Sequence, residues 1–272
     1  MPTSKKTSKT AIVPALPAFI TNRDQLAALI TSTAAVARIG GAGGSVEQEE
    51  GTILVSNRPY VTSDGLEIDA QEIFYRKEEI ASSARRLGEA DKVAWMDPET
   101  HLECIMLRSA EGGFLGGYVA VPPTHPLFGF AAEAVPAEID VHGGISYAAA
   151  CQGGPTTTRR LGREANRICH PPGRAPKSRA AIHATDYRVH DDAWWFGFTC
   201  DKVYDLVPKS TEGKSRFLGA EIGATYRDDA YVCREVEHLA RQLKALSDGA
   251  PMPDRRGPPA PPRGLDPSSG AR

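Results

Sequence analysis

The clearest sign of fold class in the sequence is KVAWMDPETHLECIMLRSAEGGFLGGYVAV, residues 92–121. It contains three short runs rich in apolar and aromatic residues, at 93–96, 103–108 and 114–121, and turn-forming residues separate them. Runs of this kind are typical of strands that pair with their neighbours along the chain. Similar runs occur at 52–56, 140–147 and 193–200. We therefore predict a mainly antiparallel sheet.

Three other segments carry apolar residues at helical spacing. The first is predicted as a helix over 22–38 with Asn22 as its N-cap, and the second as a broken or complete helix over 68–87. The third begins at Asp228, repeats apolar residues at i, i+4, i+7, i+11 and i+14, and is followed by Gly249. The expected fold class is α+β, a sheet flanked by N-terminal and C-terminal helices.

Both ends of the chain have a composition that cannot bury a core. The start is rich in Lys, Ser, Thr and Pro, and the end is rich in Pro, Arg and Gly, without apolar periodicity. We predict a disordered N-terminal tail over 1–20, one α+β domain over 21–247, and a disordered tail over 248–272. No internal repeat and no dinucleotide-binding glycine motif is visible.

The charge balance favours no class of charged partner. The 32 Lys and Arg oppose 34 Asp and Glu, for a net charge of -2, so no overall field attracts nucleic acid or an anionic membrane. The charge-free stretch between Glu111 and Glu133 contains prolines and glycines that are unsuited to a membrane helix. We expect a soluble protein without a membrane partner.

The five cysteines are odd in number, scattered, and without a CxxC pair. That pattern argues against a disulfide framework and favours a cytoplasmic location. The sequence gives little support for a zinc site, because the candidate ligands lack the short spacings of structural zinc sites. These candidates are Cys151, Cys169, His170 and Cys200. We expect no metal site, and the sequence identifies no cofactor.

The run at 140–147 carries the first candidate site residues. Strand alternation would turn Asp140 and His142 toward one polar face, where a carboxylate and an imidazole can act as a base with its orienting partner. Gly143 and Gly144 follow, and glycines within a strand mark a bulge or the close approach of a ligand or of another backbone. The alternative reading is a polar strand face bonded to a neighbouring loop.

Further candidates follow the aromatic run at 193–200. Asp201 and Asp205 come at the end of this predicted strand, and Lys202 between them could meet a substrate phosphate or neutralise a carboxylate. His125, in the turn after the strand at 114–121, could face the same cleft. The alternatives are solvated loop charges and an exposed turn histidine.

A basic segment lies between 158 and 188, with eight Lys and Arg against one Glu and one Asp. Flexible basic side chains can neutralise phosphates without reading sequence, although only Tyr187 is available there for base stacking. This segment supports nucleic-acid binding as a lesser alternative to a solvated surface loop.

Four motifs resemble those of a family of uncharacterised proteins of phages and prophage-bearing bacteria. They are GGYVAVPPTHPLFG at 116–129, DVHGGISYA at 140–148, WWFGFTCDKVYD at 194–205 and YRDDAYVCREVEHLARQL at 226–243. The resemblance brings no activity. It implies a family pattern FDxxHxxD at 198–205, where Thr199 and Lys202 replace an acid and a histidine here, which weakens a catalytic or metal role for that loop.

Three hypotheses of function remain open, and whether the protein is an enzyme is undecided. The first is a cleft of Asp140, His142, Asp201 and Asp205 that binds, and in one version hydrolyses, a small polar molecule such as a nucleotide derivative. The second is a phage-type accessory module that binds a host protein through its loops and an apolar patch. The third is nucleic-acid binding through 158–188.

Overall fold

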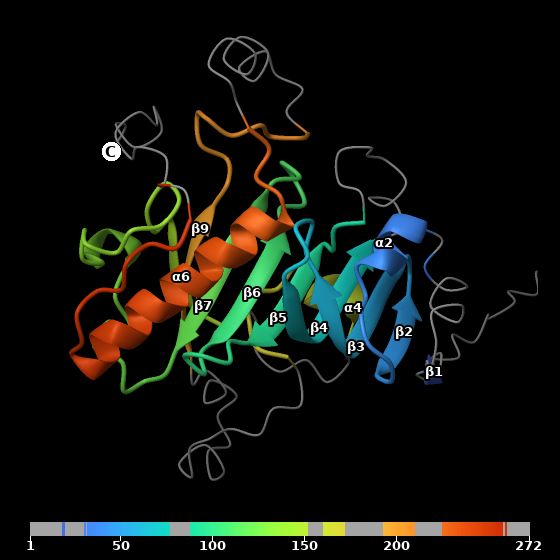
Figure 1. The fold of residues 1–272 in the computed structure, drawn as a ribbon, viewed down its shortest axis with the longest axis horizontal. Coiled ribbons are helices and arrows are strands. Elements are labelled where there is room, and N and C mark those ends of the chain that lie inside the picture. The colour runs from blue at the N-terminus through green and yellow to red at the C-terminus, as the bar shows by residue number, and fades with distance from the viewer. Residues whose placement is uncertain are drawn as a thin grey trace, which may run out of the picture.

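A nine-stranded sheet, in which every pair of neighbouring strands is antiparallel, forms the body of the computed structural model (Figure 1). The structure describes residues 18–19, 30, 32–76, 88–151, 160–171, 193–209, 225–257 and 259. Within them the strand order is β1-β2-β3-β4-β5-β6-β7-β9-β8. The chain thus makes a long meander before β9 inserts between β7 and β8.

The strand bounds agree well with the sequence in the middle of the chain. The bounds are β1 Ala18–Phe19, β2 Ser45–Glu49, β3 Thr52–Val61, β4 Glu67–Arg76, β5 Lys92–Met96, β6 Glu103–Arg108, β7 Leu115–Val121, β8 Tyr147–Ala150 and β9 Trp194–Thr199. The three strands predicted from residues 92–121 are confirmed to within a residue at each end. The short strand predicted at 52–56 is longer, because β3 and β4 pair along their whole length.

The helix predicted over 68–87 is wrong in its described part, because Glu67–Arg76 is strand β4. The register of β4 against β5 shifts between Ala70 and Glu72. The residues that enter the core are therefore Ile68 and Ala70 before the shift and Ile73 and Tyr75 after it. A bulge adds one residue to the period of two, so the spacing imitates a helix. Residues 77–87 lie outside the described part.

The C-terminal helix α6, Asp229–Asp248, is confirmed with both of its predicted ends. The Asp228 side chain accepts a hydrogen bond from the Tyr231 backbone at 3.0 Å, and Gly249 ends the helix with φ 63°. The helix crosses β6 and β7 (Figure 1). It packs closely there because Gly117 of β7 has no side chain, and a Cβ at that position would overlap Val236.

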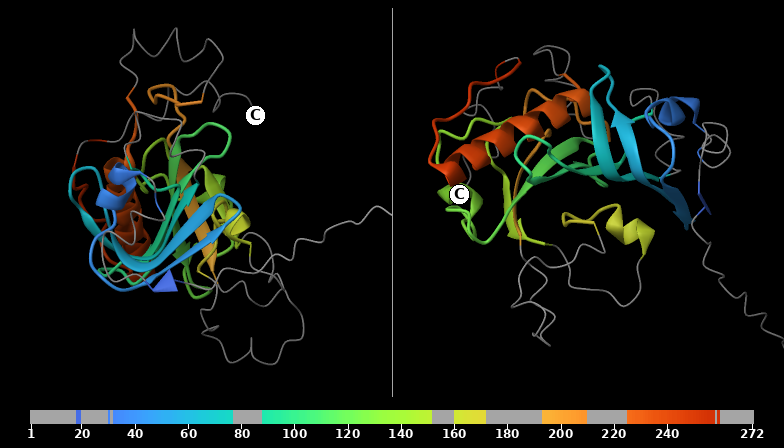
Figure 2. Two further views of the ribbon diagram at one scale, coloured as in Figure 1. Left: turned by 90° about the vertical axis from the view of Figure 1, so that its right-hand side faces the viewer. Right: turned by 60° about the horizontal axis from the view of Figure 1, so that its bottom comes forward.

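The other helices are short. Helix α2, Thr33–Ala37, places Ala35 and Val36 in the same core cluster as α6. The helix predicted over 22–38 is confirmed only at its end, because extended Ser32 is the N-cap of α2. Residues 22–29 and 31 of the predicted range lie outside the described part. Helix α4, Leu161–Glu164, packs Leu161 against Leu54 and Phe74 on the opposite face of the sheet (Figure 2). A 3-10 turn, η1, covers Ala132–Ala134. The fold is therefore mostly sheet, and the flanking helices are confirmed only in part.

The chain beyond α6 runs back along the helix. The structure describes this segment through Gly257, and Arg255 there forms ion pairs with Asp140 and Glu235. The chain that follows residue 248, predicted as a disordered tail, thus begins with residues that contact the domain. Among the described helices, none combines the length and apolar composition that a membrane span requires.

Candidate functional site

Residues 140–146 form a turn, so the strand predicted at 140–147 is wrong except for its last residue. The Gly144 N–H donates to the Val141 carbonyl at 2.9 Å, and Gly143 and Gly144 have φ of 65° and 81°. These angles lie in the left-handed region, where glycine has no steric penalty. The two glycines therefore turn the chain, and strand alternation does not govern where Asp140 and His142 point.

The turn brings His142 to Asp205. The imidazole Nε2 lies 2.7 Å from the Asp205 Oδ2, and both side chains are enclosed. Asp205 also accepts from the Lys202 backbone N–H at 3.0 Å and from the Arg227 Nε at 3.0 Å. A carboxylate that accepts from several donors is a fixed negative charge, and it can orient an imidazole.

The second ring nitrogen of His142 meets a hydroxyl. Its Nδ1 lies 2.9 Å from the Tyr231 Oη, and the two rings stand edge to face with centroids 5.5 Å apart. The carboxylate of Asp205 can only accept, so a neutral His142 carries its proton on Nε2 and accepts the Tyr231 O–H at Nδ1. Burial, followed by the nearby Glu235 charge, raises the pKa of Tyr231. The hydroxyl is therefore a neutral donor.

Polar side chains in one row on α6, all but His238, bond to the turn and hold it in place. Tyr231, Glu235, His238 and Gln242 recur at i, i+4, i+7 and i+11, and we call them the polar stripe. Gln242 accepts from the Asp140 N–H at 2.7 Å and donates to the Asp140 carbonyl at 2.9 Å. Glu235 accepts from the His142 N–H at 3.0 Å. Side chains of α6 thus fix the turn by bonding to the backbone of Asp140 and His142.

Arg227 lies at the outer end of this network, just before α6. Its guanidinium carbon stands 4.7 Å from the centre of the Tyr231 ring, and its Nε is bonded to Asp205. Within the described chain, its hydrogen bonds leave the terminal nitrogens Nη1 and Nη2 unused. The side chain is 19% exposed. A guanidinium fixed by its inner edge and its face presents its outer edge to solvent.

The structure separates the other predicted acids. Asp140 does not face Asp205; its carboxylate pairs with Arg255 at 2.7 Å. Arg255 also binds Glu235. Burial alone would lower the pKa of Arg255, but the hydrogen bonds to Glu235 and Asp140 and the charges of these carboxylates together raise it. Asp201 is exposed at the start of the loop and accepts from Thr199 at 2.8 Å. Of the four proposed catalytic residues, only His142 and Asp205 touch.

Lys202 and Gly143, two of the predicted ligand-binding residues, lie against each other. A Cβ on Gly143 would come within 2.8 Å of the Lys202 side chain. The Lys202 ammonium lies 3.2 Å from the Asp201 carboxylate. Gly144 is buried in the turn. These residues shape the turn and its neighbouring loop around His142.

His125 lies apart from the network. Its Nδ1 accepts from the Leu127 N–H at 3.1 Å, so its Nε2 donates to the Leu243 carbonyl at 2.9 Å. Leu243 is two turns of helix beyond Glu235, about 12 Å along α6. The expectation that His125 faces the same cleft is therefore wrong. This histidine joins the turn after β7 to the last part of α6.

The cysteines differ from the expectation. Cys151 and Cys169 form a disulfide, which a scattered, odd set of cysteines did not predict. Their sulfurs and a ring nitrogen of His170 all lie within 4.8 Å of one another. Cys200, the other candidate zinc ligand, is a buried free thiol in the core cluster of α6. Burial raises the pKa of the free thiols, Cys104, Cys200 and Cys233.

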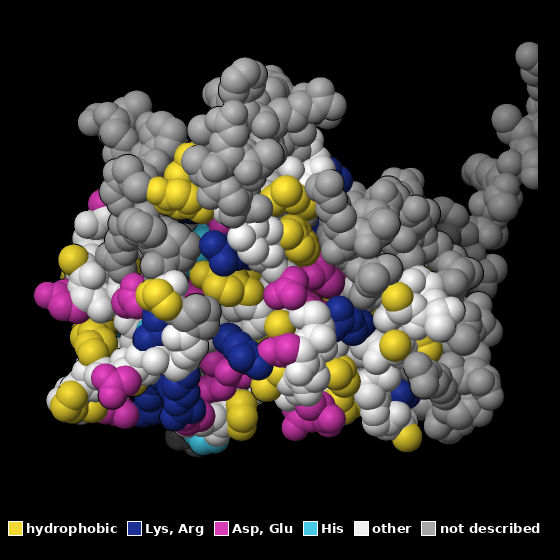
Figure 3. Space-filling view, turned by 45° about the horizontal axis from the view of Figure 1, so that its top comes forward, with side chains coloured by type: hydrophobic (Ala, Val, Ile, Leu, Met, Phe, Trp, Pro, Cys, Tyr) yellow, Lys and Arg dark blue, Asp and Glu magenta, His cyan; other side chains and the backbone are white. Residues whose placement is uncertain are grey.

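The described part of the basic segment is mostly paired with acids. Arg160 lies 3.5 Å from both Glu49 and Glu50, and Arg167 lies 3.0 Å from Glu164. Figure 3 looks at the other side of the molecule, where α6 lies, and shows Lys and Arg interspersed with Asp and Glu over the described part of that face. Residues 158–159 and 172–188 of the segment lie outside the described part.

Sequence reasoning missed Tyr231, Arg227, Glu235 and Arg255. The polar stripe carried a signal for two of them, because Tyr231 and Glu235 follow the same helical period as the apolar stripe beside them. Polar side chains at this period on a helix that faces the core indicate hydrogen-bond partners in a neighbouring segment. Arg227 and Arg255 lie in irregular segments, where no period exists.

Comparison of the chain with family models, with curated proteins and with solved structures gives no match. The likeness to phage and prophage proteins stays a prediction from the four motifs.

Proposed function

We infer that the protein binds a small polar molecule with a phosphate or carboxylate group, and we favour a nucleotide derivative. The observation that carries this inference is Arg227. Its guanidinium is fixed by Asp205 and by the Tyr231 ring, and its terminal nitrogens are unused within the described chain. Such a preset fork matches the geometry of a phosphate or carboxylate and loses little conformational freedom on binding.

The network behind Arg227 joins a hydroxyl, an imidazole and a carboxylate. When the ring is neutral, Tyr231 donates to His142 and His142 donates to Asp205. An anion bound to Arg227 would weaken the hydrogen bond between Arg227 and Asp205. Because His142 bonds to the same carboxylate, its hydrogen bond to Asp205 would change as well. Ligand binding is thus coupled to the proton positions in the network.

Hydrolysis is a narrower version of this proposal. The His142 ring is fully enclosed and both of its nitrogens are engaged. A water molecule would have to pass its proton to the half-buried Tyr231 hydroxyl, which in turn passes a proton to His142. Binding without turnover therefore has more support than catalysis.

The protein-interaction alternative has less support among the described residues. Their only exposed large hydrophobic side chain is Phe130, at 42%. A docking surface for a host protein would need several apolar or aromatic anchors close together. We keep this alternative as an outcome of the test below.

The test is thermal unfolding of the full chain in the presence of inorganic phosphate and of mono-, di- and triphosphate nucleotides. We expect at least one of these to raise the unfolding temperature, since a ligand that binds only the folded state stabilises it. Arg227→Gln should lower the affinity for that ligand at least about tenfold. Arg256→Gln is the matched control, because Arg256 is an exposed arginine whose nearest acid is Glu99 at 3.6 Å.

Equal binding by wild type and Arg227→Gln would contradict the proposed site. A protein that no phosphate compound stabilises, but that captures one defined protein partner, would support the interaction alternative instead.

A further inference from the structure

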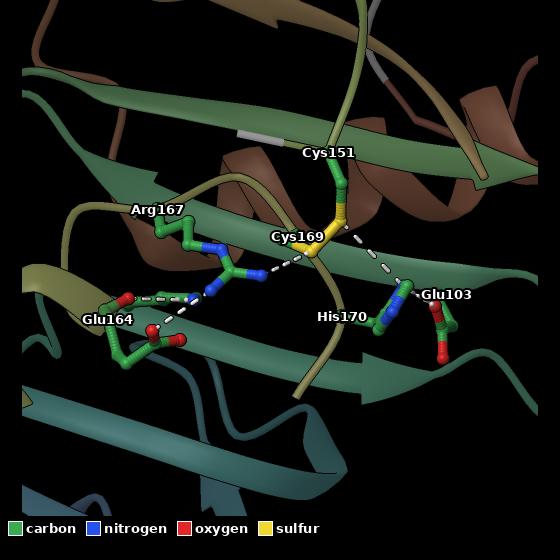
Figure 4. The surroundings of a disulfide bond; sticks show 7 residues. Glu103, Cys151, Glu164, Arg167, Cys169 and His170 are labelled. Atoms are coloured by element: carbon green, nitrogen blue, oxygen red, sulfur yellow. Dashed lines mark hydrogen bonds and ion pairs between the residues drawn. A yellow bond between two sulfur atoms is a disulfide. The ribbon is translucent and has the colours of Figure 1, made fainter. Parts of the chain in front are cut away.

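Cys151, Cys169 and His170 form a compact cluster on the sheet face opposite α6 (Figures 2 and 4). Cys151 follows directly after the edge strand β8, and Cys169 and His170 follow α4. The disulfide therefore joins the edge of the sheet to the segment that packs across its face. None of these residues contacts the His142 network in any described interaction.

We propose that this cluster is a redox-switched zinc site. In the oxidised protein the two sulfurs form the disulfide. In the reduced protein the two thiolates and the His170 Nδ1 bind one Zn²⁺, and the Glu103 carboxylate or a water molecule takes the fourth position. The chemical class of ligand is a borderline divalent cation, because thiolate and imidazole donors select such ions.

Two of the distances around His170 are close to those of a tetrahedral site. The His170 Nδ1 lies 3.9 Å from the Cys151 Sγ and 3.7 Å from the Glu103 Oε2. Ligand atoms around tetrahedral zinc stand about 3.3 to 3.8 Å apart, as follows from bond lengths of about 2.0 to 2.3 Å. Both contacts therefore need to close by only a few tenths of an ångström. The sulfurs must separate to about 3.8 Å, which rotation of the side chains can supply.

The charges around the cluster also suit a bound cation. Two thiolates and the Glu103 carboxylate carry three negative charges against the two positive charges of Zn²⁺. Arg167 donates to the Cys169 Sγ at 2.9 Å, so a positive charge lies beside the sulfurs. Glu164 holds Arg167 in place at 3.0 Å. In zinc sites the metal ligands commonly accept or donate hydrogen bonds to residues that do not touch the metal, and those residues are in turn held by further partners.

The reduction step is a two-electron exchange with a dithiol. One thiolate of the dithiol attacks the half-buried Cys151 sulfur, and the S–S bond breaks to release the Cys169 thiolate beside Arg167. The second thiol of the reductant then attacks the mixed disulfide, releases Cys151, and leaves the reductant as its own disulfide. The two protons of the dithiol pass to the protein sulfurs and leave when Zn²⁺ binds.

The expected consequence is a sheet edge held in two alternative ways. The disulfide and the metal both join β8 to the segment after α4, whereas the reduced, metal-free protein lacks both links. Zinc and oxidant therefore compete for the same two sulfurs, and binding of the metal protects them from oxidation.

The test uses the full chain, reduced with a phosphine and titrated with Co²⁺ and Zn²⁺ without oxygen. The reduced wild type should bind one ion per chain and show sulfur-to-cobalt charge transfer, and the oxidised protein should show neither. Cys151→Ser and Cys169→Ser should each bind at least about tenfold more weakly. Cys233→Ala, which removes a buried thiol outside the cluster, should bind as the wild type does.

His170→Gln keeps the disulfide and removes the imidazole, so it tests the site even where the cysteine variants fail to fold. It should form the disulfide normally and lose at least about tenfold in zinc affinity after reduction. Reduced wild type that binds no zinc, although a thiol reagent counts all five thiols in a denatured portion of the same sample, would overturn the proposal. Equal binding by the oxidised protein, or by His170→Gln, would do so as well.

Discussion

His142 and Asp205, 63 residues apart in the chain, meet at 2.7 Å beneath the first turns of α6. The contact joins the turn before β8 to the loop after β9. Tyr231 and Arg227 continue the contact on either side, through the His142 Nδ1 and the second Asp205 oxygen. The N-terminal part of α6, the turn and the loop are therefore one hydrogen-bonded unit.

Asp205→Asn should strongly destabilise the fold. An amide has one accepting oxygen in place of two, so its NH₂ group would face either His142 or Arg227, which are both donors. We expect a loss of about 3 kcal/mol in the free energy of unfolding, measured by chemical denaturation. Asp201→Asn is the control, because Asp201 is 38% exposed in the same loop, and it should cost less than about 1 kcal/mol. Equal effects would show that Asp205 is not held as described.

Gly117→Ala should disrupt the packing of α6 on the sheet. A methyl group there would overlap Val236 and Phe198, which are both buried. Forcing a group into a packed core costs about 1 to 3 kcal/mol. The control is Gly162→Ala in α4, where the nearest atom to an added Cβ is 3.6 Å away; it should be neutral or slightly stabilising. Equilibrium denaturation of both variants measures the difference.

The protein should lose stability as the pH falls below about 6.5, the unfolded pKa of histidine. Burial lowers the pKa of His125, and the opposing hydrogen bond to Leu243 does not offset it. The unfolded state then binds more protons than the folded state in acid, so the free energy of unfolding decreases until the pH reaches the folded pKa. Each such histidine contributes at most about 1.4 kcal/mol per pH unit.

His125→Gln isolates this contribution. Glutamine can accept from Leu127 and donate to Leu243, as the neutral imidazole does, but it does not titrate. The variant should therefore show a flatter pH dependence below about pH 6.5. His238, whose pKa burial also lowers, keeps part of the slope. An unchanged slope in the variant would contradict the assignment of His125.

Arg255→Gln should destabilise the protein although Arg255 follows the last helix. Its side chain neutralises Glu235, which is buried on α6, and also binds Asp140. Leaving a buried carboxylate without its charged partner costs about 1 to 3 kcal/mol. Arg256→Gln, an exposed neighbour, should change the free energy of unfolding by less than about 0.5 kcal/mol. Thermal and urea unfolding of the two variants give the comparison, and indistinguishable results would place the C-terminal segment outside the fold.

Local sequence signals predicted the elements that depend on local physics. The Asp228 cap, the apolar stripe and Gly249 predicted α6 because capping and periodicity act within one helix. β4 was missed because its bulge changes the period between Ala70 and Glu72. The turn at 140–146 was missed because the two glycines take left-handed angles, and glycine within an apolar run is equally compatible with a strand.

The candidate site is formed by contacts between segments far apart in the chain, which the spacing of residues in the sequence does not predict. Asp205 and His142 were named from the chemistry of their side chains, but their partners come from α6 and from the segments that flank it. The Cys151–Cys169 pair was missed because a disulfide depends on which segments the sheet brings together. The number of cysteines carries no such information.

The most direct test of the account is the tautomer of His142 in a nitrogen-15 NMR spectrum, recorded with and without the stabilising phosphate compound. The network predicts a proton on Nε2, an unprotonated Nδ1 that accepts from Tyr231, and a change in these signals on ligand addition that Arg227→Gln abolishes. A proton on Nδ1 of the neutral ring, or the same response in Arg227→Gln, would contradict it.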